Sequence, residues 1–244
     1  MTMTDAASAV APPTPLLWFS APVGFVEVPL EGTAEERLDR LAAAFDAIGP
    51  DVPREQRLDT AVNAELLLQA QLAQGLVYLA NCIYRTDDGE VIHAVFTIVV
   101  TRTETGGPLA FATQTTQRWA AARPQAEVGV LDLPCGRAAV ATEDRLVTVP
   151  GELYGLEGTS ESLVRQIEVA IPHPDGQHVA LVVLSTEHLA QWADWATVVG
   201  TALRELSFQD PLTALPQQQS RIAHAGPGPS VAAAIEDRIR RAFG

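Results

Sequence analysis

The sequence contains no lysine, and this absence narrows its chemistry before any motif is considered. All sixteen basic residues among the 244 are arginines. Schiff-base formation, a lysine general base and a Walker-type phosphate loop each need a lysine side chain, so these enzyme classes are excluded. A coding bias toward arginine and alanine is the simplest explanation of the composition.

Cysteine is also scarce, because Cys82 and Cys135 are the only two in the chain. Two thiols are too few for a disulfide scaffold, and neither belongs to a CxxC pair of the kind found in zinc or thioredoxin-like sites. Cys82 lies within an apolar strand-like run and is predicted to be buried, whereas Cys135, in "LPCGR", is expected at a more exposed turn. We predict a protein of the reducing cytoplasm that holds no cofactor.

Long apolar runs and an excess of positive charge are absent as well. The apolar runs are shorter than the roughly 18–20 residues of a membrane helix, and the N-terminus does not match a secretory signal. Thirty acidic residues against sixteen basic ones give a net charge of −14, and such a surface repels phosphate backbones and anionic headgroups. We therefore expect a soluble acidic protein that neither binds nucleic acid nor inserts into a membrane.

Composition and periodicity divide the chain into four parts. We predict a disordered lead-in, a folded domain, a linker and a short amphipathic helix, at residues 1–15, 16–208, 209–229 and 230–244 respectively. The linker is rich in proline, glutamine and glycine and shows no periodicity. The length of the chain suits one large domain with such an appendage.

Helical and strand-like patterns alternate irregularly within the predicted domain. Two successive helices are predicted at 33–49 and 53–75, the first with a capping box of Thr33 and Glu36. Further helices are expected at 109–124 and 186–208. Strands are expected at residues 25–30, 76–86, 91–103, 126–134, 137–150, 161–174 and 177–186. This order predicts an α+β fold, with a mostly antiparallel sheet flanked by helices in an α/β/α sandwich.

From about Leu16 to Phe208 this succession resembles the Mog1/PsbP-like α/β/α sandwich proteins. The resemblance lies in the entry strand "PVGFVEVPL" and in the closing amphipathic helix after paired strands, "VALVVLST…W…LRELSF". The two successive helices between residues 33 and 75 are an expansion of that layout. The resemblance implies a non-catalytic binding or assembly-factor role and assigns no functional residue.

Three histidines are the first candidates for a chemical site. His173 and His178 flank Asp175-Gly176 in "IPHPDGQHVALVVLST", and His188 follows shortly after. A zinc site needs three or four ligands in tetrahedral reach, and a hydrolase needs a histidine near a carboxylate. The alternative is a β-hairpin in which Asp175 and Gly176 make the turn and the histidines lie on its rim.

Other catalytic motifs have less support. Ser185 lacks the GxSxG surroundings of a nucleophile elbow, and with Thr186 it is explained as the start of the long helix. Neither GxGxxG nor a phosphate-binding loop is present, so the sequence supports no nucleotide site.

The candidates for protein contact are one tryptophan and the C-terminal helix. Trp195 lies about 60° off the apolar stripe of helix 186–208, so it is either a core anchor or an exposed interface aromatic. One face of the C-terminal helix carries Val231, Ile235, Ile239 and Phe243, while acids and arginines cover the rest. A tethered amphipathic helix suits docking on a partner protein or on another copy of the chain, and folding back onto its own domain is equally compatible.

These features together predict a non-enzymatic protein-binding or assembly protein that contacts a partner or associates with itself into an oligomer. The alternative is a hydrolase whose site is assembled from distant residues, with His173, His178 and His188 as the first suspects. A concave pocket in which two or more histidines meet a carboxylate would favour the hydrolase.

Overall fold

The computed structural model describes residues 17–48, 52–86, 89–103, 105, 107–150 and 158–210. The strands in this part are β1 (Val26–Glu27), β2 (Leu76–Arg85), β3 (Val91–Arg102), β4 (Glu127–Leu133), β5 (Gly136–Pro150), β6 (Thr159–Pro172) and β7 (His178–Thr186). The α-helices are α1 (Ala34–Ile48), α2 (Arg54–Ala73), α3 (Pro108–Ala122) and α4 (Trp192–Glu205). The predicted lead-in and the C-terminal residues Val231, Ile235, Ile239 and Phe243 lie outside the described residues.

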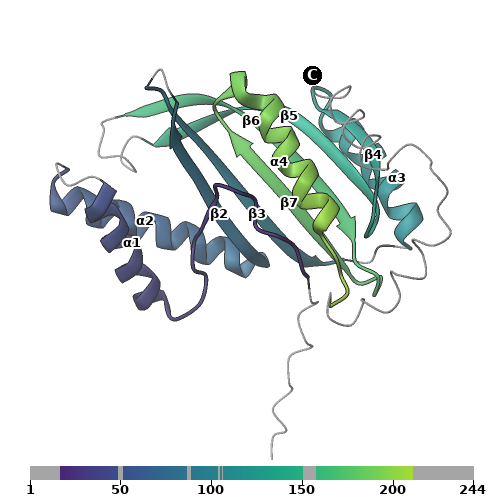
Figure 1. The fold of residues 1–244 in the computed structure, drawn as a ribbon, viewed down its shortest axis with the longest axis horizontal. Helices are drawn as coiled ribbons and strands as arrows, with labels where there is room; N and C mark the ends of the chain where they lie inside the picture. The colour runs from purple at the N-terminus through teal and green to yellow at the C-terminus, as the bar shows by residue number, and fades with distance from the viewer. Residues whose placement is uncertain are drawn as a thin grey trace, which may run out of the picture.

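The described strands form one antiparallel sheet in the order β1-β2-β3-β7-β6-β5-β4 (Figure 1). Every neighbouring pair in this order is antiparallel. The hairpins β2–β3, β4–β5 and β6–β7 are those that the turn residues predict, and the sheet confirms the α+β class.

Helix α4 covers one face of the sheet, and the main core lies between them. Along β3 every second side chain is fully buried on this face: Ile92, Ala94, Phe96 and Ile98. Helix α4 contributes Trp192, Val199 and Leu203 to the same cluster. The two-residue period of the strand and the 3.6-residue period of the helix thus bring their apolar sides together, and Figure 1 shows α4 lying across the sheet.

Helix α3 covers the opposite face at the β4 end of the sheet. Phe111 and Trp119 of this helix pack on Ala139, Ala170 and Val179. The Arg123 guanidinium, next to the end of α3, reaches the Glu168 carboxylate at 2.7 Å. Helices on both faces make the α/β/α arrangement. Figure 1 shows α3 beside β4 and the α1–α2 hairpin beside β2, at the other end of the molecule.

The closing helix begins later than the sequence predicts. Thr186 belongs to β7 and pairs with Ala94 on one side and Arg165 on the other. A 3₁₀ turn, Leu189–Gln191, then precedes α4. The Thr186 hydroxyl donates to the His93 carbonyl at 2.7 Å and accepts the His188 N–H at 3.0 Å. Pairing with two neighbouring strands therefore keeps Thr186 in the sheet, although the sequence pattern predicts it as the start of the helix.

The structure also decides between the two interpretations of Trp195 and moves one strand boundary. Trp195 is only 4% exposed and packs edge-on against Phe25 at 5.9 Å, so the structure places it in the core, as the core-anchor interpretation states. The strand expected at residues 161–174 begins two residues earlier, because Thr159 pairs with Pro150. Both outcomes arise from contacts with other segments of the chain.

Candidate functional site

The α1–α2 hairpin starts with the capping box that the sequence predicts. The Thr33 N–H donates to Glu36 Oε2 at 2.7 Å, and the Glu36 N–H donates to Thr33 Oγ1 at 3.2 Å. These bonds satisfy two backbone donors that the first turn of a helix leaves free. They fix the point at which the chain turns from the sheet edge into α1.

A buried ion pair joins α1 to α2. Arg37 and Glu65 are 8% and 4% exposed, and Arg37 Nη2 lies 2.6 Å from Glu65 Oε1. Arg37 Nη1 also donates to the Gly32 carbonyl, and Gln69 Nε2 donates to Glu65 Oε1. Burial alone would raise the pKa of Glu65, but the hydrogen bonds from Arg37 and Gln69 and the charge of Arg37 outweigh it and lower the pKa. The pair therefore stays ionised and holds the two helices together.

The C-terminal end of α2 is attached to the sheet at Gly75. The Val100 N–H of β3 donates to the Gly75 carbonyl at 2.8 Å. Gly75 has a φ of +95°, and a Cβ at this position would clash with the Val100 carbonyl oxygen. Only glycine fits this approach, so the joint fixes where the hairpin leaves the sheet.

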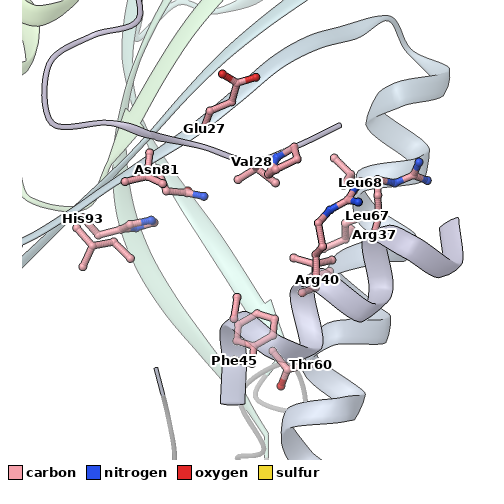
Figure 2. A pocket seen from close by; sticks show the side chains of 16 residues that line it. Glu27, Val28, Arg37, Arg40, Phe45, Thr60, Leu67, Leu68, Asn81 and His93 are labelled. Carbon is pink, nitrogen blue, oxygen red and sulfur yellow. The ribbon is translucent and has the colours of Figure 1, made fainter. Parts of the chain in front are cut away.

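Between this hairpin and the sheet lies an open cavity of about 650 Å³, which we call the hairpin pocket (Figure 2). Its floor is Asn81 of β2 and His93 of β3, and Ile83 of β2 lines it nearer the mouth. The helices and the chain around β1 supply the walls, whose apolar residues are Val26, Val28, Pro29, Leu41, Ala44, Phe45, Ala64, Leu67 and Leu68. The volume falls within the range of pockets that bind ligands in proteins.

Two polar side chains on the floor of the hairpin pocket have no hydrogen-bond partner within the described residues: Asn81 and His93. They lie on adjacent strands and share a face, because Asn81 pairs with Val95, two residues from His93. Figure 2 shows the amide and the imidazole side by side, with Phe45 and Arg40 across the pocket. Their donors and acceptors are available to an occupant of the pocket.

Burial sets the protonation state of His93. It lowers the pKa of the imidazole, and the charge of Glu187, which acts in the opposite direction, does not overcome it. His93 is therefore neutral at neutral pH, with one ring nitrogen as donor and the other as acceptor. A neutral imidazole beside an amide suits hydrogen bonding to an uncharged polar group.

The mouth of the hairpin pocket is apolar and exposed. Val26, Ile83 and Leu67 all line the pocket, yet they are 73%, 60% and 57% exposed. Charged groups at the mouth include Glu27 and Arg40, and Arg40 donates to the Glu31 carbonyl. Large apolar side chains thus surround the opening and meet water.

The histidines of the β6–β7 turn belong to the architecture of the hairpin. Asp175 Oδ1 accepts the N–H groups of Gln177 and His178 at 2.8 and 3.1 Å, and Asp175 Oδ2 lies 2.6 Å from His178 Nδ1. Burial would raise the pKa of Asp175, but these bonds and His173 hold it well below its usual range. Gly176 supplies the φ of +72°, so Asp175 and Gly176 make the turn as the hairpin interpretation states.

Two of the three suspect histidines meet at the turn, where His173 Nδ1 lies 3.1 Å from Asp175 Oδ1 on the carboxylate that His178 also contacts, but the third does not join them. His173 packs against Phe208, with ring centroids 4.7 Å apart, whereas His188 follows the other end of β7, with Nδ1 3.4 Å from Glu90 Oε1. In the described ranges, no group of three or more His, Cys, Asp or Glu residues is placed to hold a metal ion. The Ser185 hydroxyl donates to Gln166 Oε1. Neither of the two described cavities is lined by a pair of histidines.

The two thiols are protonated at neutral pH. Burial raises the pKa of Cys82, which is 6% exposed as the sequence predicts. Cys135 is half-buried, and burial raises its pKa to about 11. A thiol attacks as its thiolate, so neither residue is an activated nucleophile.

Comparison with protein-family models, with curated proteins and with solved structures found no match to this chain. The resemblance to Mog1/PsbP-like sandwich proteins therefore stays a prediction. No helix in the described part of the chain is long and apolar enough to cross a membrane.

Sequence reasoning did not find the hairpin pocket. The alternation of β3 places His93 on the face opposite Ile92 and Ala94, but a strand pattern does not name what packs on that face. One pattern was available: α2 carries large apolar residues around most of its circumference, at Leu58, Val62, Leu66, Leu67, Leu68 and Leu72. A helix that is apolar on several sides is expected to meet more than one surface.

Proposed function

We propose that this protein is a non-enzymatic protein-binding module, and that the hairpin pocket is its binding site. The observation that supports this proposal is the apolar rim, because Val26, Ile83 and Leu67 are each more than half exposed around an apolar cavity. A small molecule inside the cavity leaves this rim in water. An amphipathic segment of protein covers both the cavity and the rim, as helices do in apolar grooves.

The polar floor of the hairpin pocket gives such a site its selectivity. Asn81 and His93 offer hydrogen bonds at the base of an otherwise apolar cavity. A few polar groups within an apolar site orient the occupant, because a segment that leaves them unpaired loses affinity. The proposal therefore predicts a segment with apolar side chains and one polar group that reaches the floor.

The dye ANS, which binds exposed apolar surface, probes the hairpin pocket in the full chain. Leu66 and Leu67 are a matched pair, since both are 57% exposed on α2 and only Leu67 lines the pocket. We expect Leu67→Asp to weaken ANS binding about tenfold, because it removes apolar contact and adds a charge. Leu66→Asp, which adds the same charge next to it, is expected to change binding little.

The measurement is a fluorescence titration of the wild type and the two variants at equal protein concentration. Circular dichroism confirms that each variant keeps its fold. Each substitution is also made together with Ile235→Asp, so that docking of the chain's own C-terminal stretch does not offset a loss of ANS affinity. Equal effects of Leu67→Asp and Leu66→Asp in both backgrounds would show that the hairpin pocket is not the binding site.

A further inference from the structure

We infer that the segment bound in the hairpin pocket is the chain's own C-terminal stretch, residues 230–244, docked onto its own domain. This inference rests on the proposed function, because it names the occupant of the same site. Its grounds are the apolar pattern of the stretch, the length of chain that precedes it and the distribution of charge.

The apolar pattern of residues 230–244 matches an apolar groove. Val231, Ile235 and Ile239 recur every four residues and Phe243 follows four residues later, which is the spacing of one helical face. A helix over the thirteen residues 231–243 is about 20 Å long. Its apolar face has the anchors that helix-in-groove recognition uses.

The chain leaves the described structure close enough to the hairpin pocket for this docking. Ser207 and Trp18 exchange two backbone hydrogen bonds, of 2.9 and 2.8 Å, just before the last described residue, Asp210. Trp18 precedes Val26, a pocket residue, by eight positions, which span at most about 28 Å. The nineteen residues 211–229 reach about 65 Å when extended, and a flexible chain of that length spans about 24 Å on average.

The charges of the two parts are opposite. The 34 residues after Asp210 carry four arginines and two acidic residues, a net charge of +2. The preceding 210 residues carry twelve arginines and twenty-eight acidic residues, a net charge of −16. At the hairpin pocket itself Arg37 is paired with Glu65, and Glu27 and Arg40 at the mouth carry opposite charges, so the attraction comes from the negative charge of the domain as a whole. The field of the domain therefore attracts the C-terminal stretch.

The tether favours docking within one molecule over exchange with a second copy. A linker of this kind gives the attached stretch an effective concentration in the millimolar range. When the protein is present at micromolar concentration, the C-terminal stretch of a second copy is about a thousandfold more dilute than the tethered one. Docking within the chain therefore needs only a weak interface.

Releasing the C-terminal stretch tests the inference in the full chain. Ile235→Asp places a charge on the apolar face, and Ala233→Asp places the same charge on the opposite side of the predicted helix. If the stretch fills the hairpin pocket nine-tenths of the time, Ile235→Asp raises the apparent affinity for ANS about tenfold. Ala233→Asp is expected to bind ANS with the affinity of the wild type. The double variant Leu67→Asp with Ile235→Asp is expected to bind ANS more weakly than Ile235→Asp alone, because Leu67→Asp damages the pocket that the release exposes.

The outcomes separate this inference from the proposal on which it rests. ANS affinity that is unchanged by Ile235→Asp but weakened by Leu67→Asp overturns the C-terminal stretch as occupant and leaves the protein-binding site standing. Leu67→Asp by itself also loosens the docked stretch, so the decisive comparison is made in its absence: if Leu67→Asp combined with Ile235→Asp binds ANS as tightly as Ile235→Asp alone, both are overturned.

Photo-crosslinking gives a second measurement that leaves the C-terminal stretch unaltered. A photo-reactive amino acid in place of Leu67 is expected to crosslink to residues 231–243, and the same group in place of Leu66 is not. The absence of that crosslink from position 67 contradicts the inference. In a mixture of isotopically heavy and light protein, crosslinks that join heavy to light chains would show that a second copy supplies the stretch.

Discussion

At the scale of single residues, the Arg37–Glu65 pair decides whether the α1–α2 hairpin holds its shape. Both side chains are almost fully removed from water, so the cost of desolvating the two charges offsets much of their attraction. Arg37 reaches Glu65 through two nitrogens and Gly32 through a third. The pair therefore adds little net stability, but the loss of either partner alone would leave an uncompensated buried charge.

Removing one partner of this pair is expected to destabilise the protein strongly. Glu65→Leu leaves the Arg37 guanidinium buried without its counter-charge, and such a loss costs about 3–5 kcal/mol. Urea denaturation followed by circular dichroism measures the free energy of unfolding.

The matched control replaces both partners. Arg37→Met with Glu65→Leu buries two apolar chains of similar size, and it is expected to recover most of the stability that Glu65→Leu loses. If Glu65→Leu alone were as stable as the wild type, the α1–α2 hairpin would not depend on the Arg37–Glu65 pair.

At the scale of elements, the joint between α2 and β2 sets the position of the hairpin against the sheet. Gly75 and Gly89 share a left-handed conformation, with φ values of +95° and +92°. They differ in their surroundings, because a Cβ at Gly75 meets the Val100 carbonyl and a Cβ at Gly89 meets no described atom within 4 Å. The two positions therefore separate backbone conformation from steric contact.

Alanine at these two glycines is expected to have unequal effects on stability. Gly89→Ala carries only the cost of a left-handed alanine, about 1–2 kcal/mol. Gly75→Ala carries that cost and also pushes the backbone of β3 away from α2, so we expect a clearly larger loss. Thermal unfolding measures both variants, and a loss at Gly75 no greater than at Gly89 would contradict the close approach.

At the scale of the whole molecule, helix α4 and the α1–α2 hairpin differ in how much apolar surface they bury. Strands β3 and β7 lie in the middle of the sheet, and α4 buries Trp192, Val199 and Leu203 on them. The hairpin lies at the edge, and α2 buries only Ala61, Glu65 and Leu68 within the described residues. Local stability follows the number of buried apolar contacts.

Amide hydrogen exchange is expected to follow this division. Peptides from β3, β7 and α4 exchange slowest, and peptides from α1 and α2 exchange faster, because an opening of the hairpin leaves the main core intact. Mass spectrometry of the full chain measures the exchange. Equal protection of the hairpin and α4 would mean that the two unfold as one unit.

The sequence by itself determined the features that depend on near neighbours. The alternation of Ile92, Ala94, Phe96 and Ile98 defines the buried face of β3, the Thr33–Glu36 pair starts α1, and Asp175-Gly176 makes a turn. Each feature follows from a local period or a local hydrogen bond. The α+β class and the antiparallel sheet could be predicted from these elements.

Only the tertiary structure decided what depends on distant contacts. Thr186 is a strand residue because β3 and β6 pair with it, and Trp195 is buried because Phe25 packs on it. Asn81 and His93 share the floor of the hairpin pocket because β2 and β3 pair in one register beneath a hairpin held by Arg37 and Glu65. A local pattern carries a period but not the register or the partner of each segment, and the candidate site is built from those contacts.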